Sequence, residues 1–381
     1  GGAVAVSSED AHRATVAVYE ERALEWEASR PPRLDDAARF ADRIGDLDPD
    51  DEGPVVDLGC GPGWHLPVLP AGTVAVDAAA AMLDLTGGRA PGAPRVQADL
   101  RALPFARGAL RAVWANKSYV HLDRRLVPRA LWDLHRSVRP GGLVFLGVFL
   151  GDEDHAGFAE DPFGGRSFSL WTEELLAAVV DGAGFDVVDR VDHTDTGKGY
   201  VGLTLVRRHG LADTVGPSMR LLLVGLNASP MSAERGVGYA RPGNRAWPAL
   251  LAAGLATVDR DPRHLLDHHR IGMTDLVKRP TARADEVTPE EFRAGAARLD
   301  RLCRWLRPDA VCVLGVTGWR AAVDRRAVVG PQPGTLGGRP VYVMDNPSGL
   351  NARATVDRLA GDLLAAAALA DERRPDPPEE P

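Results

Sequence analysis

A glycine-rich turn follows an early apolar run in this sequence of 381 residues. The run Val55–Leu58 leads into Gly59–Gly63, which reads Gly-Cys-Gly-Pro-Gly. Glycine lets the backbone turn tightly and approach a ligand with no side chain in between. A second apolar run ends in Asp77, where a carboxylate can accept hydrogen bonds from both hydroxyls of a ribose. The spacing therefore predicts a site for a ribose-containing cofactor.

Nicotinamide and S-adenosylmethionine cofactors both use this geometry, and three later features of the sequence decide between them. These are a stretch that fits an adenine-framing loop, a Pro-Gly-Gly turn before an apolar strand, and a helix start that leads to Ala-Gly-Phe; they lie at Val96–Phe105, Arg139–Leu143 and Trp171–Phe185. In this order they resemble the class I S-adenosylmethionine-dependent methyltransferase family over roughly residues 12–208.

The resemblance implies S-adenosyl-L-methionine as cofactor and S-adenosyl-L-homocysteine as product. By it, the three loop glycines line the methionine and ribose, Asp77 holds the ribose, and Asp99 meets the adenine amino group. Asp57 is expected mainly to hold the glycine loop. The residues expected at the cofactor are Asp57, Gly59, Cys60, Gly61, Gly63, Asp77, Asp99, Leu100 and Asn116.

The methyl acceptor is less well specified, and we expect it near Ala115–His121, beyond the strand that ends at Trp114. His121 could act as a catalytic base near neutral pH, although a histidine that only packs is the favoured interpretation. The domain offers neither a Pro-Cys pair that could attack a pyrimidine ring nor the Asn-Pro-Pro-aromatic signature of amino-group DNA methylation. With an acidic surface, these absences favour a small-molecule or free-base acceptor.

A second set of chemistry-bearing residues begins where the apolar run Leu221–Leu226 ends in Asn227. Further blocks follow at Gly236–Ala240, Arg241–Trp247, Ile271–Thr281 and Asn346–Asn351. Their order and spacing resemble the mismatch-specific uracil/thymine-DNA glycosylases across residues 219–367. Cleaving an N-glycosidic bond leaves negative charge on the departing base, so such a protein must position a water and hydrogen-bond that base.

The resemblance implies a catalytic role for Asn227, which would position the water, and a stacking role for Tyr239 on the extruded base. The loop Asn346–Leu350 would enter the duplex, with Leu350 filling the vacated space and Gly349 allowing close approach. The residues expected to contact base or DNA are Tyr239, Asn244, Asn346, Ser348, Gly349, Leu350 and Arg353. The implied partner is double-stranded DNA with a mismatched base.

Two departures from the glycosylase pattern leave alternatives open. Ala228 stands where the family usually has proline, which removes a restraint on the loop. Asp275 stands where the family can carry a lysine. Intact Asn227 favours an active hydrolase beside the methyltransferase, whereas Ala228 favours a non-hydrolytic nucleic-acid or nucleoside binding module that serves it. A fusion of two unrelated activities is the third interpretation, and Asn227, Tyr239 and Leu350 could each be structural.

Short apolar runs alternate with helix-length segments in both halves, which predicts α/β folds. We expect a Rossmann-like, doubly wound parallel sheet, followed by a smaller α/β/α domain. The predicted strands are Val55–Leu58, Thr73–Val76, Ala112–Trp114, Leu143–Phe149, Phe185–Val188, Gly202–Val206, Leu221–Leu226, Ala310–Leu314 and Pro340–Met344. The main predicted helices are Ala79–Leu85, Thr172–Gly182, Trp247–Ala253, Pro289–Leu306 and Ala354–Leu369, with further helices before residue 50.

Domain limits follow from these patterns and from charge. We expect a methyltransferase at 1–208, a linker at 209–215, a glycosylase-like domain at 216–367 and a disordered tail at 368–381. Residues 1–215 hold 22 Lys and Arg against 33 Asp and Glu, a net charge of −11, whereas residues 216–367 hold 21 against 15, a net charge of +6. The basic half could therefore meet phosphates.

The remaining composition narrows the class of protein. Three cysteines are too few and too scattered for a disulfide framework or a zinc site, so no metal is expected. No apolar run reaches the roughly 20 residues that cross a bilayer, and no signal peptide is visible. We therefore expect a cytoplasmic protein with no membrane partner.

Overall fold

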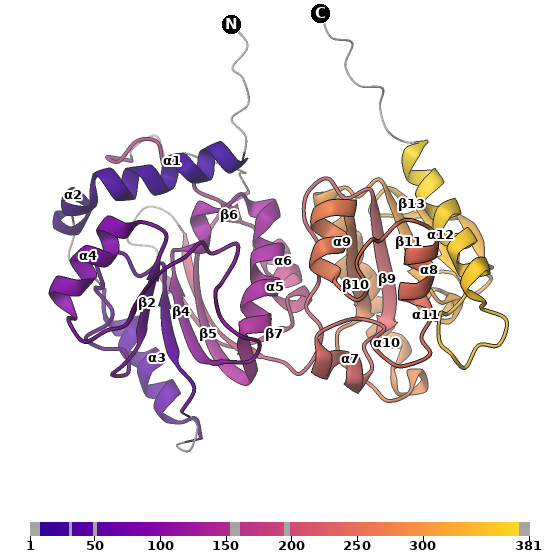
Figure 1. Ribbon diagram of the computed structural model, residues 1–381, viewed down its shortest axis with the longest axis horizontal. Coiled ribbons are helices and arrows are strands. Elements are labelled where there is room, and N and C mark those ends of the chain that lie inside the picture. Colours follow the sequence, from indigo (N-terminus) through magenta and orange to yellow (C-terminus); the bar gives the residue numbers. More distant parts are fainter. Residues whose placement is uncertain (1–7, 30–32, 49–51, 153–160, 194–198, 373–381) are drawn as a thin grey trace, which may run out of the picture. The chain divides into compact units, whose positions relative to one another are not determined.

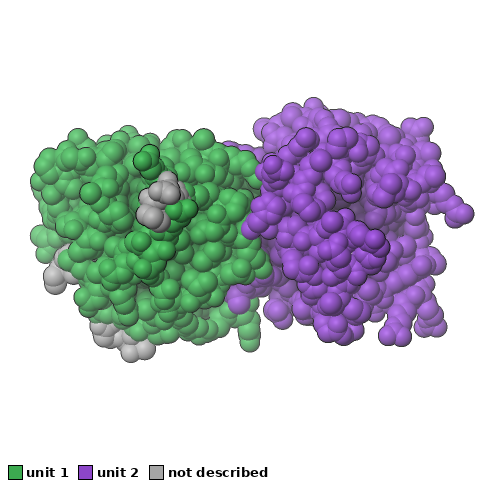
Figure 2. Space-filling model, turned by 90° about the horizontal axis from the view of Figure 1, so that it is seen from below, with its two compact units in different colours: residues 1–176, 185–208 green, residues 177–184, 209–381 purple. Residues whose placement is uncertain are grey.

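The computed structural model describes residues 8–29, 33–48, 52–152, 161–193 and 199–372. Its elements are drawn in Figure 1. The chain divides into two compact units, one made of residues 1–176 and 185–208 and the other of residues 177–184 and 209–381 (Figure 2). The first unit thus ends at residue 208, and residues 177–184 belong with the second unit.

The first unit is built on an eight-stranded sheet in the order β3-β2-β1-β4-β5-β8-β7, with β6 paired to β5. Its strands are β1 (Val55–Leu58), β2 (Val74–Asp77), β3 (Arg95–Gln97), β4 (Leu110–Asn116), β5 (Val138–Leu150), β6 (Leu170–Trp171), β7 (Phe185–His193) and β8 (Tyr200–Arg207). Strands β1 to β6 pair in parallel. Strand order reverses between β1 and β4, and ligands of such sheets bind at the carboxyl ends of the strands at that point.

The expected Rossmann-like, doubly wound parallel sheet is confirmed, and only its far edge is antiparallel, where β8 pairs with both β5 and β7. A few residues suffice to join two antiparallel strands, whereas a parallel pair needs a crossover. Only six residues separate the end of β7 from the start of β8, which fits the antiparallel pairing.

Helices surround this sheet. They are α1 (Ser8–Glu21), α2 (Ala23–Ala28), α3 (Asp35–Gly45), α4 (Ala80–Arg89), α5 (Val127–Ser137) and α6 (Glu173–Gly182), with short 3-10 turns η1 (Tyr119–His121) and η2 (Arg124–Leu126). On α3, Phe40 and Ile44 point into a core with Trp114 and Phe145. The rings of Trp114 and Phe145 are stacked at 4.1 Å. This packing fixes the strands β4 and β5 that carry part of the site.

The second unit contains a five-stranded sheet in the order β10-β9-β11-β13-β12. The strands are β9 (Leu221–Asn227), β10 (Ile271–Val277), β11 (Ala310–Leu314), β12 (Gly330–Leu336) and β13 (Arg339–Met344). All neighbours pair in parallel except the edge strand β12. The helices are α7 (Pro230–Arg235), α8 (Ala246–Ala252), α9 (Pro262–His269), α10 (Pro289–Leu306), α11 (Val316–Ala322) and α12 (Val356–Asp371), with the 3-10 turn η3 (Ala284–Glu286).

Two apolar cores lie on opposite faces of this second sheet, which confirms the expected α/β/α layers. One joins the sheet to α8, α9 and α12, and the other joins it to α10 and α11. The sequence specifies α10 closely: Thr288 and Glu291 form a capping box at its start, with Pro289 in the first turn. These residues satisfy amide groups that the first turn would otherwise leave unpaired.

The segment expected to be a linker is instead built into the second unit. Thr214 pairs with Met273, and Asp213 is 3% exposed. The Asp213 carboxylate accepts hydrogen bonds from Lys278 Nζ at 2.7 Å and Arg298 Nη1 at 2.6 Å. A charged side chain can be buried in this way only when it is paired, so this segment is a structural part of the fold.

The first residues of the expected disordered tail are helical instead. Helix α12 continues to Asp371, and Ala370 is buried. The Asp371 carboxylate accepts from Arg220 Nε at 2.9 Å, which ties the helix end to the sheet. The rest of the predicted tail, residues 373–381, lies outside the described residues.

The structure also bears on membrane spans, disulfides and metal sites. No helix among the described residues is both long and apolar enough to cross a membrane. All three cysteines are buried and unpaired. A cluster of three or more potential metal-ligating side chains is absent from the described part of the chain.

Candidate functional sites

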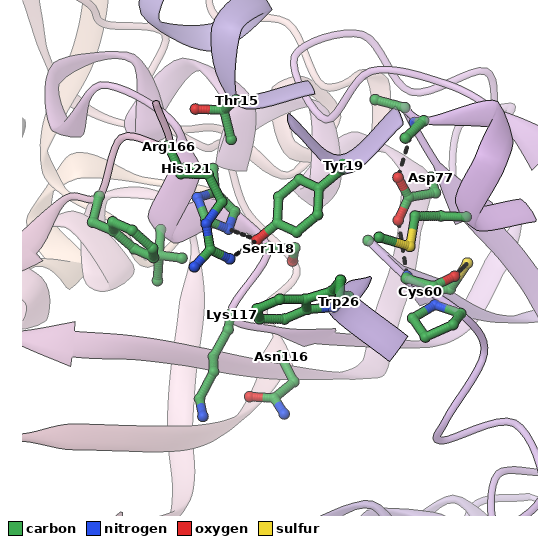
Figure 3. A pocket seen from close by; sticks show the side chains of 18 of the residues that line it. Thr15, Tyr19, Trp26, Cys60, Asp77, Asn116, Lys117, Ser118, His121 and Arg166 are labelled. Carbon is green, nitrogen blue, oxygen red and sulfur yellow. Dashed lines mark hydrogen bonds between the residues drawn. The ribbon is translucent and has the colours of Figure 1, made fainter. Parts of the chain in front are cut away.

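A cavity of about 510 Å³ opens at the carboxyl ends of β1, β2 and β4 in the first unit. Its walls come from the glycine loop, the end of β2, the segment after β4 and the helices α1 and α2 (Figure 3). This is the switch point of the sheet, where a ligand is expected. Among the predicted cofactor residues, Gly59, Cys60, Gly61, Asp77, Leu100 and Asn116 line the cavity, as does His121.

The glycine loop has a backbone that other residues could not adopt without strain. Gly59, Gly61 and Gly63 have φ of +73°, +53° and +77°. A Cβ atom at Gly59 would lie 2.4 Å from the Cβ of Ser118. The amides of Gly59 and Cys60 donate to the Val76 carbonyl at 2.8 and 2.9 Å, which clasps the loop to β2. Glycine is therefore required for close packing, as the sequence pattern indicated.

Asp77 sits at the end of β2 and supports the loop from the other side. Its Oδ2 accepts from the Gly61 amide and its Oδ1 from the Ala79 amide, both at 2.9 Å. Burial raises the pKa of Asp77, although the amides of Ala79 and Gly61 work in the opposite direction. A carboxylate oxygen can accept more than one hydrogen bond, so both oxygens retain capacity for ribose hydroxyls.

Asp57 and Asp99, which the sequence also assigned to the cofactor site, are not among the residues that line the cavity. Asp57 is 1% exposed, and its Oδ2 has no hydrogen-bond partner among the described residues. Burial, with the nearby Asp77 charge, raises the pKa of Asp57 to about 8. Gly63 also lies away from the cavity walls.

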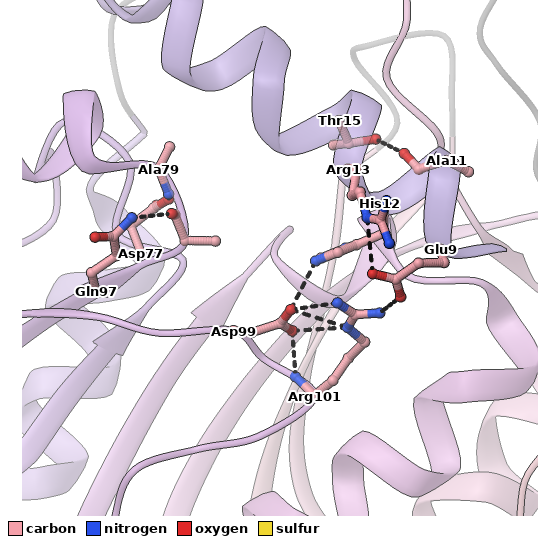
Figure 4. Close-up of polar contacts among 11 residues, drawn as sticks. Glu9, Ala11, His12, Arg13, Thr15, Asp77, Ala79, Gln97, Asp99 and Arg101 are labelled. Atoms are coloured by element: carbon pink, nitrogen blue, oxygen red, sulfur yellow. Dashed lines mark hydrogen bonds and ion pairs between the residues drawn. The ribbon is translucent and has the colours of Figure 1, made fainter.

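Asp99 is held by protein groups rather than open to an adenine (Figure 4). Arg101 Nη2 donates to its Oδ2 at 2.6 Å, and the ring of His12 contacts the same oxygen at 3.1 Å. Burial alone would raise the pKa of Asp99, but the bonds from His12 and Arg101 lower it. In this structure Asp99 therefore anchors helix α1, and contact with adenine would require these partners to move.

Asn116 and Ser118 face the cavity from the end of β4. Asn116 Oδ1 accepts from the Tyr200 hydroxyl at 2.8 Å. Ser118 is 5% exposed, and its hydroxyl has no hydrogen-bond partner among the described residues. A buried hydroxyl without a partner costs free energy unless a ligand or water satisfies it. Between them, Lys117 has a left-handed backbone with φ of +59°, a conformation that is strained for a residue with a side chain.

His121 forms a hydrogen-bonded chain with Tyr19 and Arg166 (Figure 3). Its Nδ1 lies 2.9 Å from the Ser167 carbonyl, which can only accept, so Nδ1 carries the proton. Burial lowers the pKa of His121 to about 4, so the ring is neutral and Nε2 accepts from the Tyr19 hydroxyl at 2.7 Å. Arg166 Nη1 donates to the Tyr19 oxygen at 2.8 Å.

Aromatic rings wall the same end of the cavity. Trp26 meets Tyr19 edge to face at 5.5 Å, and Phe168 lies 4.9 Å from the ring of His121. The Arg166 guanidinium lies 4.6 Å from the centre of the Trp26 ring and pairs with Asp161, whose Oδ2 accepts from Nε at 3.0 Å. The predicted packing-only role for His121 therefore differs from its observed place, which is a polar chain in the cavity wall.

Asn227 lies at the carboxyl end of β9 in the second unit. Its Nδ2 donates to Thr281 Oγ1 at 2.7 Å and to the Arg279 carbonyl at 3.1 Å. Both amide hydrogens are thus engaged, which fixes the side chain with its Oδ1 as the remaining acceptor. The Thr281 amide donates to the Ala228 carbonyl at 3.1 Å, so the loop holds a restraint of its own where proline is missing.

Tyr239 and Asp275 approach the same strand end. Both side chains occupy the space beside Gly225, where a Cβ would lie 2.3 Å from Asp275 Oδ1 and 2.8 Å from the Tyr239 hydroxyl. Tyr239 has a left-handed φ of +59° and packs against the core. Tyr239 therefore lies beside Gly225, which is two residues before Asn227 on β9, and its ring also packs against the core.

The loop Asn346–Leu350 is held by hydrogen bonds at its base, while the side chain at its tip is exposed. Leu350 is 92% exposed. Arg245 holds the loop: its amide donates to the Pro347 carbonyl at 2.9 Å and its Nη1 to the Asn351 carbonyl at 2.8 Å. A Cβ at Gly349 would lie 2.7 Å from the Gly243 carbonyl oxygen, so this glycine allows a close backbone contact within the protein.

Among the other residues predicted to contact DNA, Asn244 and Asn346 accept hydrogen bonds from backbone amides of the protein. Asn244 Oδ1 accepts from the Ala246 amide at 2.9 Å, so this side chain bonds the first amide of α8. Asn346 Oδ1 accepts from the Ser348 amide at 2.9 Å, and Arg353 is exposed. The glycosylase-type residues therefore gather at one edge of the sheet, with Asn244 turned to a structural role.

Part of each unit matches a known protein family. Residues 55–142 match the family described as a methyltransferase domain, and residues 212–367 match the uracil DNA glycosylase superfamily. The chain joins a methyltransferase domain to a uracil DNA glycosylase superfamily domain. Both resemblances expected from the sequence are confirmed at this level.

Solved structures similar to the chain include three with sequence identities of 17%, 21% and 19%. The 1,6-didemethyltoxoflavin-N1-methyltransferase of Burkholderia thailandensis is 17% identical with a TM-score of 0.43, covering 55% of this chain and 93% of that one. DhpI in its complex with SAH is 21% identical with a TM-score of 0.41, covering 53% and 99%. The geranyl diphosphate C-methyltransferase of Streptomyces coelicolor A3(2) is 19% identical with a TM-score of 0.36, covering 45% and 77%.

Several side chains at these sites have no local sequence signal. In the methyltransferase domain, Tyr19 and Arg166 reach the cavity from distant segments, and Ser118 is an ordinary serine after a strand. In the glycosylase superfamily domain, Thr281 and Arg245 support the predicted residues through bonds that only the fold creates. Thr281 and Arg245 lie within the blocks Ile271–Thr281 and Arg241–Trp247, and that position is the signal that could have pointed to them.

The partly buried Asp275 gives a testable link between pH and stability. Burial raises its pKa to about 6, although Lys278 acts against this. Because the folded pKa lies above the unfolded value of about 3.9, this carboxyl favours folding at low pH, and the benefit is lost as pH rises through the folded pKa.

Asp275→Asn should therefore unfold at a temperature a few degrees above the wild type at about pH 7.5, and at nearly the same temperature at about pH 4. Calorimetric melting of the full chain at both pH values measures this. Asp267→Asn on the exposed side of α9 is the matched control. An equal difference at both pH values would contradict the assignment.

Proposed function

We propose that the chain is bifunctional, with S-adenosylmethionine-dependent methyl transfer in the first unit and hydrolysis of the N-glycosidic bond of mismatched uracil or thymine in the second. The observation that carries the first activity is the glycine loop clasped by Asp77 at the sheet's switch point. Gly59, Gly61 and Asp77 would hold the methionine and ribose, and the product would be S-adenosylhomocysteine. The methyl acceptor is a small molecule, which fits a cavity of about 510 Å³.

The test for the first activity is cofactor binding by the full chain. Calorimetry should show binding of S-adenosylhomocysteine and none of NAD. Binding of NAD with equal or higher affinity would overturn the proposal. The reason for this choice is that the loop offers Asp77 for a ribose and that residues 55–142 match a methyltransferase domain.

The second activity rests on the orientation of Asn227. With its amide hydrogens committed to Thr281 and Arg279, the Oδ1 can accept from a water that attacks the anomeric carbon. Exposed Leu350 would fill the duplex after base flipping, and Tyr239 would stack on the base. Flipping costs a few kcal/mol and is cheapest for a mispaired base, so a G:U pair should be preferred over A:U.

Ala228 supports a second candidate, a non-hydrolytic module that binds nucleic acid or a nucleoside for the methyltransferase. The two are separated by single-turnover release of uracil from a duplex with one G:U mismatch, with protein in excess. Release that depends on Asn227 identifies the hydrolase. If the wild type binds the duplex but releases no base, the binding module is the function.

Duplex binding should weaken with salt, because residues 216–367 carry a net charge of +6. Log affinity should fall linearly with log salt, and Arg353→Gln should lower the slope by about 1. Fluorescence anisotropy of a labelled duplex with the full chain measures both. Arg13→Gln, an exposed arginine of the first unit, is the control and should leave the slope unchanged. A flat salt response would rule out a phosphate-led interface.

A further inference from the structure

The acceptor end of the methyltransferase cavity contains a polar chain that cofactor binding does not use. Tyr19, His121 and Arg166 all line the cavity that also contains the glycine loop. Tyr19 is the central member, since its hydroxyl donates to His121 Nε2 and accepts from Arg166. A hydroxyl oxygen has two lone pairs, so the Tyr19 oxygen can accept one further hydrogen bond from a ligand.

The direction of this chain is fixed by its two ends. The Ser167 carbonyl keeps the proton on His121 Nδ1, so Nε2 is the only position from which the ring can take up a second proton. Arg166 is 7% exposed and paired with Asp161, so its own proton stays in place. A proton delivered to the Tyr19 oxygen can therefore move in one direction only, as the Tyr19 proton passes to His121 Nε2.

The walls around this chain are aromatic. Trp26, Phe149, Phe168 and Tyr200 line the cavity together with Tyr19. Such rings favour a flat aromatic partner, which they can contact face to face or edge to face. Trp26 lies against the Tyr19 ring at 5.5 Å, so a flat molecule beside it would reach the Tyr19 hydroxyl with its edge.

Resting on the methyl transfer proposed above, we propose that the acceptor is a small planar aromatic or heteroaromatic molecule methylated on a hydroxyl, a ring N–H or an aromatic amine, with Tyr19 as the catalytic residue that receives its proton. The acceptor oxygen or nitrogen forms a bond to the cofactor methyl carbon. The S–CH3 bond breaks, and its electron pair stays on sulfur, which becomes a neutral thioether. The acceptor proton moves to the Tyr19 oxygen, the Tyr19 proton moves to His121 Nε2, and water removes it as products leave.

The strength of the base supports this acceptor class. Burial holds the pKa of His121 at about 4, with Arg166 and His12 acting in the same direction and Ser167 and Asp161 against them. Such a base takes a proton only from a group that becomes strongly acidic as methyl transfer proceeds. An aromatic hydroxyl, a ring N–H and an aromatic amine do so. An alkylamine does not, because its methylated ammonium keeps a pKa near about 10.

Matched pairs of probes test the proposal with the full chain and S-adenosylmethionine. Phenol, aniline and uracil are compared with cyclohexanol, cyclohexylamine and 5,6-dihydrouracil, and methylated product is measured by mass spectrometry. Product is expected from at least one aromatic probe and from none of the saturated ones. Methylation of cyclohexylamine, or none of any aromatic probe by protein that binds the cofactor in calorimetry, would overturn the inference. Absence of cofactor binding would instead overturn the proposed methyl transfer itself.

Variants then test the role of Tyr19. Tyr19→Phe keeps the ring and should lower turnover of the aromatic probe by about 100-fold, with cofactor affinity nearly unchanged. His121→Gln should have a similar effect, and the double variant should be no slower than the slower single one, because the two act as a unit. Tyr119→Phe is the control, since its buried hydroxyl lies outside the cavity and has no partner among the described residues. Unchanged turnover in Tyr19→Phe would exclude the assignment.

Discussion

Replacing Asn227 with alanine should slow single-turnover release of uracil from a G:U duplex by about 100-fold or more, while duplex affinity stays near that of the wild type. The physical reason is that the Asn227 amide is fixed by Thr281 and Arg279, leaving Oδ1 to hold the attacking water. Alanine removes the water acceptor without touching the loop at Asn346–Leu350. Base release is followed by chromatography, and affinity by anisotropy of a labelled duplex.

The Thr281 hydroxyl offers a finer test of the same mechanism. Thr281→Val keeps the shape but removes the acceptor for the Asn227 amide, so the rate should fall roughly 10-fold through loss of orientation. Thr281→Ser should restore it. Thr257→Val is the matched control, because Thr257 is exposed and its hydroxyl bonds with the ring of His269. If the valine and serine variants at 281 react equally fast, Asn227 is not oriented by this bond.

Asp77→Ala should weaken binding of S-adenosylhomocysteine by about 2–3 kcal/mol. The substitution removes the acceptors for the ribose hydroxyls and also leaves the amides of Gly61 and Ala79 without their partner. The loop would therefore lose a clasp as well as a ligand contact. Calorimetry of the full chain measures the change.

A control on the neighbouring helix separates this effect from a general loss of charge. Asp84 is exposed on α4, a few residues beyond Asp77, and Asp84→Ala should bind as the wild type does. Asp77→Asn should bind nearly as poorly as the alanine variant, because an amide cannot accept at both positions. Equal affinity of wild type and Asp77→Ala would remove Asp77 from the cofactor site.

Buried apolar runs allowed accurate prediction of the central strands and of α10. The bounds of β1, β11 and α10 agree with those expected from the sequence, because their residues are uniformly buried or carry a strong cap. The polar strand β3 and the Pro- and Gly-rich strand β12 were not predicted, since neither has an apolar run. Pairing with a neighbour determines such edge strands, and sequence periodicity does not report it.

The sequence could define only part of the site in the first unit. Some of its residues are near each other in the chain, whereas others meet only in the folded structure. The glycine loop and Asp77 follow two consecutive strands, β1 and β2, so their spacing along the chain reveals the site. Tyr19 meets His121 across 102 residues and Arg166 across 147, and no local pattern records those contacts. The sequence could not show that Asp99 pairs with Arg101 and His12, because the contact with His12 depends on how α1 packs.

The cavity also gives the first unit an intrinsic optical reporter. Trp26 and Trp64 line it with ring centres 6.0 Å apart. By contrast, Trp114, Trp171, Trp247 and Trp319 are almost fully buried. A ligand that stacks in the cavity would alter the fluorescence of this pair, so occupancy of the methyltransferase site can be followed without a label.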